Sequence, residues 1–140
     1  MIRRARPGDC GEIKRLMDLC VRPTWSGDAV RAAVEREGNR FLVLEEGGRI
    51  AGYVVLETAL DEGSLTSLAV APEVRRRGYG SALVREAING CGPEIRTVFL
   101  EVEATNEAAR SLYEKAGFRE ISVRKRYYGD ADAVIMSLSI

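Results

Sequence analysis

The sequence predicts a mixed α/β fold, in which a central twisted sheet of about seven strands is flanked by about four helices. Apolar runs such as Phe41-Leu42-Val43-Leu44 are typical of buried strands, and Gly47-Gly48 is typical of a tight turn between two strands. Other segments repeat apolar residues at helical spacing. The resulting order, β-α-α-β-β-β-α-β-α-β-β, contains both hairpins and βαβ crossovers, so the sheet is expected to be mixed.

The N-terminal third is expected to hold one strand and two helices. The strand covers residues 2–6, and Pro7-Gly8-Asp9 opens the first helix, with Asp9 suited to its positive first turn. Pro23 ends that helix, and Ser26 is placed to cap the second one. The apolar faces of the two helices comprise Ile13, Leu16, Met17 and Cys20, and then Ala29, Val30, Ala33 and Val34.

The rest of the chain is expected to alternate strands with two further helices. Glycine and proline mark the boundaries, as at Pro72, Gly92-Pro93 and Gly129-Asp130. In chain order, the expected elements are strands at 41–44, 50–60 and 64–70, a helix at 78–90, a strand at 97–102, a helix that Thr105 or Asn106 caps and Gly117 ends, and strands at 118–127 and 133–140.

Length and composition favour one domain spanning residues 1–140. The 140 residues are 46% hydrophobic, which suffices for one buried core. Lys plus Arg and Asp plus Glu each number 21, so the chain lacks the basic excess that nucleic-acid or membrane-surface binding requires. No apolar run approaches the ~18 residues of a membrane span. The basic N-terminus is not followed by an apolar stretch, so no signal peptide is expected. We therefore expect a cytoplasmic protein with no nucleic-acid or membrane partner.

Histidine is absent from the chain, and this restricts its chemistry. The three cysteines fit no metal or disulfide pattern, so no metal is expected and a reducing environment is favoured. Serine–histidine and cysteine–histidine mechanisms are excluded, so a general base must be Asp, Glu, Lys, Tyr, Cys or water. Cys91 has no activating neighbour and is not expected to act as a nucleophile.

The segment Arg75-Arg76-Arg77-Gly78-Tyr79-Gly80 lies between an expected strand and an expected helix. Helix N-termini leave backbone N–H groups free and carry a partial positive charge, and glycine lets a phosphate approach the backbone closely. The spacing is not that of the nucleotide P-loop, nor that of the dinucleotide fingerprint, which would need glycine in place of Leu83. On the residues alone, a phosphate site and an ordinary glycine-bearing turn are both open.

Glu101 and Tyr113 are the two candidate proton-transfer groups downstream of that loop. In a strand, Glu101 shares a face with Thr97, Phe99 and Glu103, because successive side chains alternate between faces. The carboxylate lies either on a solvated face or at a cleft where it accepts a proton. Tyr113 is either a core aromatic with its hydroxyl at the edge or a phenol that donates a proton to a leaving thiolate.

Two motifs in the chain resemble those of one acetyltransferase family. Arg75-x-x-Gly78-x-Gly80 is similar to the Q/R-x-x-G-x-G/A signature of the GNAT acetyltransferases, and Leu100 to Phe118 is similar to the second half of that family's cofactor site. The resemblance implies the GNAT fold and acetyl-CoA as co-substrate. It also implies that backbone amides of the loop bind the pyrophosphate, that the end of the preceding strand meets the pantetheine arm and the acetyl carbonyl, and that an asparagine contacts CoA. The cofactor-binding residues implied are Leu68, Ala69, Val70, Arg76, Arg77, Gly78, Tyr79, Gly80, Ser81 and Asn106.

Within that family, the chain most resembles the ribosomal-protein alanine N-acetyltransferases (RimI-like) and related protein N-terminal acetyltransferases. Three further segments carry this likeness, namely Pro23-Thr24-Trp25-Ser26, with Thr24 as an extra residue, Asp61-Glu62-Gly63-Ser64-Leu65, and Arg124-Lys125-Arg126-Tyr127-Tyr128 with the later Asp132-Ala133-Val134-Ile135-Met136. The resemblance implies an acceptor such as the N-terminal alanine of ribosomal protein S18. It further implies that Glu101 is the base and Tyr113 the acid. The expected walls of the peptide slot are Trp25, Tyr127 and Tyr128.

Two alternatives stay open at this point. A GNAT enzyme for a small amine or a lysine side chain would share the cofactor site and differ only in the acceptor slot. The short turn from Tyr128 to Asp132 departs from the longer loop of many family members and leaves the peptide specificity less secure than the cofactor. A non-catalytic CoA-binding module is the second alternative, and intact Glu101 and Tyr113 argue against it. The sequence does not give the oligomeric state.

Overall fold

The computed structural model describes the backbone of residues 1–128 and 131–140, and the side chains of residues 1–125 and 131–140. It has seven strands and four α-helices in the expected order, which confirms the predicted fold class. The strands are β1 (Ile2–Arg4), β2 (Arg40–Glu46), β3 (Arg49–Ala59), β4 (Glu62–Val70), β5 (Thr97–Glu103), β6 (Arg119–Tyr128) and β7 (Ala131–Ser139). The helices are α1 (Cys10–Cys20), α2 (Gly27–Glu35), α3 (Tyr79–Asn89) and α4 (Glu107–Lys115).

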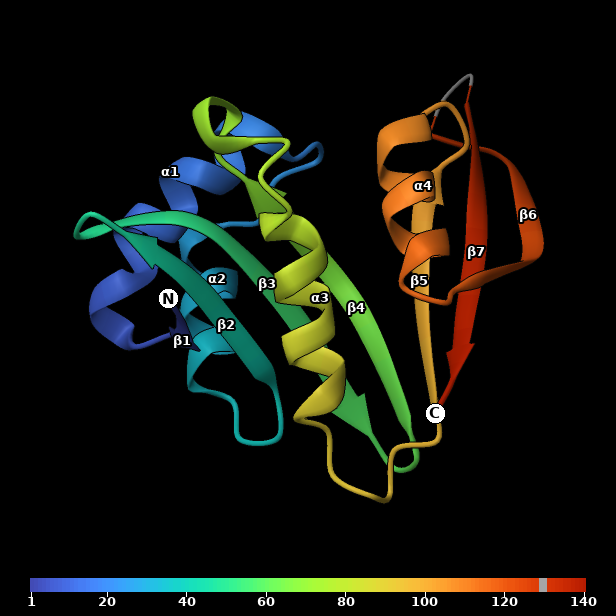
Figure 1. Cartoon of the computed structure of the whole chain (residues 1–140), viewed down its shortest axis with the longest axis horizontal. Coiled ribbons are helices and arrows are strands. Elements are labelled where there is room, and N and C mark those ends of the chain that lie inside the picture. The colour runs from blue at the N-terminus through green and yellow to red at the C-terminus, as the bar shows by residue number, and fades with distance from the viewer. Residues whose placement is uncertain (129–130) are drawn as a thin grey trace.

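The seven strands form one mixed sheet in the order β1-β2-β3-β4-β5-β7-β6. Every neighbouring pair is antiparallel except β4 and β5, which are parallel and are joined through α3. Figure 1 shows α3 and α4 in front of the sheet, and α1 and α2 behind β1 to β4. The sheet therefore presents one face to α3 and α4 and the other face to α1 and α2.

Apolar side chains on both faces of the first four strands build the core. Leu83, Val84 and Ala87 of α3 are fully buried against one face, and Ile13, Met17 and Val30 of α1 and α2 are fully buried on the other. These are the residues that helical spacing placed on the apolar faces.

The helix ends are satisfied by polar side chains from nearby segments. Ser26 caps α2, since its hydroxyl accepts a hydrogen bond from the amide of Ala29 at 3.0 Å. Arg40 of β2 donates to the carbonyls of Ala87 and Glu86 at 2.8 and 3.0 Å, which satisfies acceptors at the C-terminal end of α3.

The strand β4 contains one extra residue in the middle of its pairing with β3. Val55 pairs with Ser67 and Leu56 with Leu65, so Thr66 has no partner and forms a bulge. The parallel pairing of β4 with β5 stops at the same place, because its last pair joins Leu65 to Leu100. Beyond that pair the two strands diverge, as the upper part of Figure 1 shows. Residues 66–70 of β4 and 101–103 of β5 do not pair with each other, and we call these two segments the β4–β5 divergence.

Several expectations from the sequence differ in detail from the structure. Pro7-Gly8-Asp9 forms a 3-10 turn that leads directly into α1, which begins at Cys10 with Asp9 as its N-cap residue. The Asp9 carboxylate accepts two hydrogen bonds from Arg3, of 2.8 and 3.0 Å. The expected turn at Gly129-Asp130 lies outside the described residues. Among the described residues, no helix is long and apolar enough to cross a membrane.

Candidate active site

The loop before α3 presents a run of free backbone amides. Arg76 and Gly78 both have left-handed backbone conformations, with φ values of 68° and 80°, and α3 begins at Tyr79. None of the six amides from Arg76 to Ser81 donates a hydrogen bond to any residue that the structure describes. A curved row of free N–H groups at a helix N-terminus fits an anionic group such as a pyrophosphate.

The side chains around this loop are tied back to neighbouring elements. The Arg75 guanidinium donates to the carbonyl of Val70 at 3.1 Å and to the Cys20 thiol at 3.5 Å. Arg77 forms an ion pair of 3.3 Å with Glu46, which also accepts a hydrogen bond from the Tyr79 hydroxyl. These contacts fix the loop against α1 and the β2–β3 hairpin. What the loop offers to a ligand is therefore chiefly its backbone, as the sequence predicts.

The β4–β5 divergence begins beside the end of this loop. Leu68, Ala69 and Val70 pair with β3 on one side only, since their parallel pairing with β5 has ended. Apart from the Val70 carbonyl, which Arg75 already occupies, the outer backbone groups of this segment are available to an amide-bearing ligand, which can add to a strand edge through main-chain hydrogen bonds. The segments predicted to bind the pyrophosphate and the pantetheine arm thus follow one another in the chain, from Leu68 to Ser81. The turn 71–75, which the Arg75 contacts hold in place, lies between them.

Glu101 is the first residue of β5 beyond its last pair with β4. Val98, Leu100 and Val102 are buried on one face of β5, whereas Glu101 is exposed on the other, as the alternation predicts. Its side chain is 32% exposed and forms an ion pair of 3.2 Å with Arg124 of β6. The structure therefore places Glu101 at the edge of the divergence, with a fixed cationic partner that sequence reasoning missed.

Tyr113 is a buried residue of α4, on the face of the sheet opposite to Glu101. Its ring packs edge-on against Phe118, with centroids 5.9 Å apart. Burial, and to a smaller extent the nearby Tyr53 phenol, raises the pKa of Tyr113 to about 12. The phenol therefore stays protonated across the physiological range, which a proton donor requires. No described residue forms a hydrogen bond with its hydroxyl.

The other predicted residues lie in different places. Asn106 is the N-cap of α4, where its side-chain oxygen accepts from the Ala109 amide at 3.2 Å. Trp25 is half-buried in the connection between α1 and α2, where its backbone amide donates to the Met17 sulfur at 3.4 Å. The side chains of Tyr127 and Tyr128 lie outside the described residues, so their expected role in the peptide slot stays a prediction.

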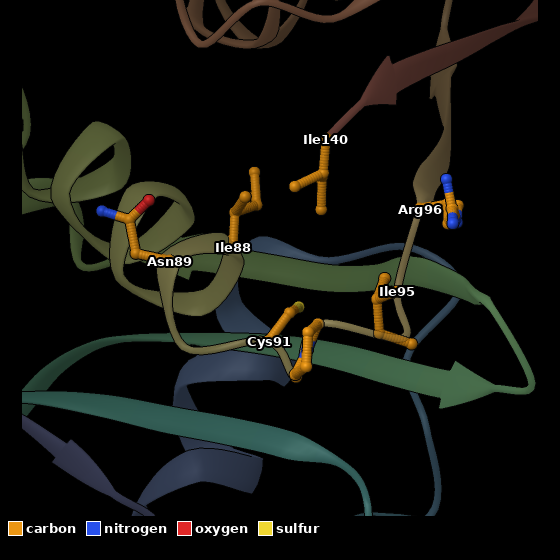
Figure 2. A pocket seen from close by; sticks show the side chains of 8 residues that line it. Ile88, Asn89, Cys91, Ile95, Arg96 and Ile140 are labelled. Atoms are coloured by element: carbon orange, nitrogen blue, oxygen red, sulfur yellow. The ribbon is translucent and has the colours of Figure 1, made fainter.

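A cavity of about 300 Å³ lies at the other end of α3 and is a different feature (Figure 2). Its walls include Ile88, Cys91, Ile95 and Ile140, and it is separated from the phosphate loop by the length of α3, about 16 Å. The Cys91 thiol donates to the Ala87 carbonyl at 3.5 Å, and burial raises the pKa of this thiol. Cys91 is accordingly no activated nucleophile, as the sequence predicts.

Comparison with known proteins agrees with this geometry. Residues 10–118 match the acetyltransferase (GNAT) family. The ribosomal protein bS18-alanine N-acetyltransferase of Escherichia coli K12 is 39% identical over 111 residues, which cover 74% of this chain and 75% of that protein. The crystal structure of the ribosomal-protein-S18-alanine N-acetyltransferase from E. coli superposes with a TM-score of 0.89 at 30% identity, over 100% of this chain and 93% of that one. Arabidopsis thaliana NAA60 in complex with acetyl-CoA shares the fold, with a TM-score of 0.91 at 18% identity over 100% of this chain and 98% of that one.

The chain belongs to the acetyltransferase (GNAT) family. It is an N-acetyltransferase that depends on acetyl-CoA, as the resemblance of the two sequence motifs implies. The described residues contain no group of His, Cys, Asp and Glu side chains that could hold a metal ion.

Gly78→Ala tests whether the loop conformation serves acetyl-CoA. A side chain at φ 80° costs about 1–2 kcal/mol, while the added methyl group itself would meet no atom within 4 Å. We expect the acetyl-CoA dissociation constant, measured by calorimetry, to rise about tenfold as the row of amides shifts. Gly48→Ala in the β2–β3 turn is the matched control, because Gly48 has φ 78° and equal free space. Equal binding by both variants would contradict the assignment.

Proposed function

We propose that this enzyme acetylates the N-terminal α-amine of a protein, with an alanine-first ribosomal protein as the acceptor class. The observation that carries the acceptor assignment is the likeness to the E. coli ribosomal-protein-S18-alanine N-acetyltransferase, which extends over the whole chain at 30% identity. The position of Glu101 also supports the acceptor assignment. Glu101 pairs with Arg124 at the divergence, on the sheet face away from α3 and α4, and an amine that enters from that face needs a base.

In this proposal, acetyl-CoA binds from the side of α3 and α4. The amides of Arg76 to Ser81 hold the pyrophosphate, and Leu68, Ala69 and Val70 hold the pantetheine arm along the free edge of β4. A backbone N–H in that segment stabilises the oxyanion that forms on the acetyl carbonyl. Asn106 contacts CoA from the start of α4, where its side-chain nitrogen has no partner among the described side chains.

The chemistry is a direct transfer in a ternary complex. An α-amine has a pKa of about 7.7–8.0 and must lose a proton before it attacks. Glu101 takes that proton, directly or through a water, the nitrogen–carbon bond forms, and the carbon–sulfur bond breaks. Tyr113 donates its hydroxyl proton to the departing sulfur. A thiol pKa is ordinarily about 8.5, so the Tyr113 phenol, with a pKa of about 12, is the weaker acid. Its transfer therefore depends on apolar surroundings that also make the thiolate more basic.

We also propose that residues 1–140 form one domain that acts in the cytoplasm. All three cysteines, Cys10, Cys20 and Cys91, are free, which suits a reducing compartment.

The proposed acceptor is tested by acetyl-CoA turnover, followed as release of free CoA thiol. The panel holds peptides with free or blocked N-termini, some with alanine first, together with common polyamines. We expect turnover only with free N-termini and the highest kcat/KM with alanine first. Turnover of polyamines, or of blocked peptides through lysine, would keep the acetyltransferase and overturn the acceptor assignment.

Glu101→Gln is expected to lower kcat/KM about 100-fold at pH 7, the usual contribution of a general base. Activity recovers in part at high pH, where the free amine needs no base. The measurement is a pH profile of kcat/KM with an alanine-first peptide. Glu103→Gln, two residues further along the same face of β5, is the matched control and should keep the activity. A loss of equal size at every pH would instead assign Glu101 a positioning role.

Tyr113→Phe is expected to lower kcat about tenfold or more without changing the dissociation constant of acetyl-CoA. Because the pKa of Tyr113 is raised to about 12, its deprotonation contributes nothing to the pH profile below about pH 10. The variant should therefore keep the alkaline limb of the wild type. Kinetics from pH 7 to 10 and calorimetry check both points, and an unchanged kcat would remove Tyr113 from the acid role.

A further inference from the structure

A groove of about 390 Å³ lies along α2 and is not used by the chemistry described above. We call it the α2 groove. One face of α2 supplies Ala29, Ala32 and Ala33, which follow helical spacing, and Trp25 and Arg36 lie just before and just after the helix. Its lining residues are Trp25, Ala29, Ala32, Ala33, Arg36, Asn39 and Glu57.

The strand register places the α2 groove on the same face of the sheet as Glu101. Glu57 pairs with Ser64, and Ser64 pairs with Phe99, so the three residues lie in one row across β3, β4 and β5. Phe99 and Glu101 are two residues apart in β5 and share a face. Glu57 and Glu101 are two strands apart across the sheet and two residues apart along it. Their Cα atoms are therefore about 12 Å apart.

The sheet face between these two positions is open. Ser64 and Glu101 are exposed and Phe99 is only half-buried, whereas the same strands bury Leu65 and Leu100 on the other face. A polypeptide with its amine at Glu101 can run over this face to the α2 groove. At about 3.3 Å per residue, 12 Å corresponds to three or four residues of extended chain.

The polar groups of the groove are the acceptor oxygens of Asn39 and Glu57 and the donor N–H groups of Arg36, Trp25 and the Asn39 amide. Asn39 is 2% exposed, and its side-chain nitrogen donates to the Ala33 carbonyl at 3.1 Å. Its Oδ1 is buried with no partner in the part of the chain that the structure describes, which is costly for a buried acceptor. The Glu57 carboxylate meets only the outer end of Arg36, at 3.7 Å, in a pair whose arginine is 59% exposed.

We infer that the α2 groove binds the side chain of an acceptor residue three to five positions from the N-terminus, and that it prefers arginine or lysine there. The aliphatic stem lies against Trp25 and the alanines, and the cationic head donates to Glu57 and to Asn39. Arg36 moves into solvent as the new cation arrives. This inference rests on the proposed acetylation of protein N-termini and names a selectivity determinant for it.

The test uses alanine-first hexapeptides, otherwise built of serine and glycine, in which one arginine is moved from position 2 to position 6. We expect kcat/KM to peak with arginine at position 3, 4 or 5, about tenfold above the arginine-free peptide, mainly through a lower KM. A peptide with glutamate at the same position should fall below the arginine-free one. An alanine-first tripeptide without arginine provides the reference for chemistry alone.

Two variants connect the preference to the groove. Glu57→Gln should reduce the tenfold preference to about twofold, while Glu37→Gln, an exposed neighbour outside the groove, should leave it unchanged. Ala32→Leu fills the groove from an exposed helical position and should raise the KM of arginine hexapeptides without affecting the tripeptide. Acetylation of all peptides with no dependence on the arginine position would overturn the inference and keep the proposed function. Failure to acetylate any free N-terminus would overturn both.

Discussion

The divergence of β4 from β5 is the constraint on which the rest of the site depends. One extra residue, Thr66, bends β4 just where its parallel pairing with β5 ends at Leu65 and Leu100. Unpaired backbone groups inside a protein are costly unless water or a ligand satisfies them, so this interruption is a place prepared for an amide-bearing ligand. The two parts of the sheet are joined by the parallel pairing of β4 with β5 before the divergence, and α3 also lies close to α4. A Cβ on Gly80 would lie only 2.8 Å from Leu112.

The sheet separates the two substrates by charge as well as by position. The side of α3 offers free amides and a helix N-terminus, an environment that favours the anionic pyrophosphate. The opposite face carries Glu101, and the carboxylate of Glu57 lies on the same face about 12 Å away. This environment favours a cationic amine or side chain. Arg75 and Arg77, in the loop before α3, are held by Val70 and Glu46. They therefore do not pair with the carboxylates on the face of Glu101. In the proposed arrangement, the two substrates approach from opposite faces of the sheet and meet at the divergence.

Local pattern was sufficient for the elements and for the loop that precedes α3. Helical spacing identified the buried faces of α1, α2 and α3, and strand alternation put Glu101 opposite Leu100 and Val102. The amides before α3 could be anticipated because glycine conformation and helix termini are local properties of the chain. The structure differs in detail at the start of α1, where Pro7-Gly8-Asp9 forms a 3-10 turn before the helix and Asp9 pairs with Arg3 of β1.

By itself, the sequence determined the order of strands and helices, the free amides from Arg76 to Ser81 and the family, because each depends on residues close together in the chain. Only the tertiary structure decided what meets across the sheet. Three features join segments far apart in sequence: the ion pair of Glu101 with Arg124, the burial that raises the pKa of Tyr113 to about 12, and the α2 groove, where the Asn39 oxygen has no partner among the described residues. Their positions follow from strand register and helix packing, which no single segment encodes.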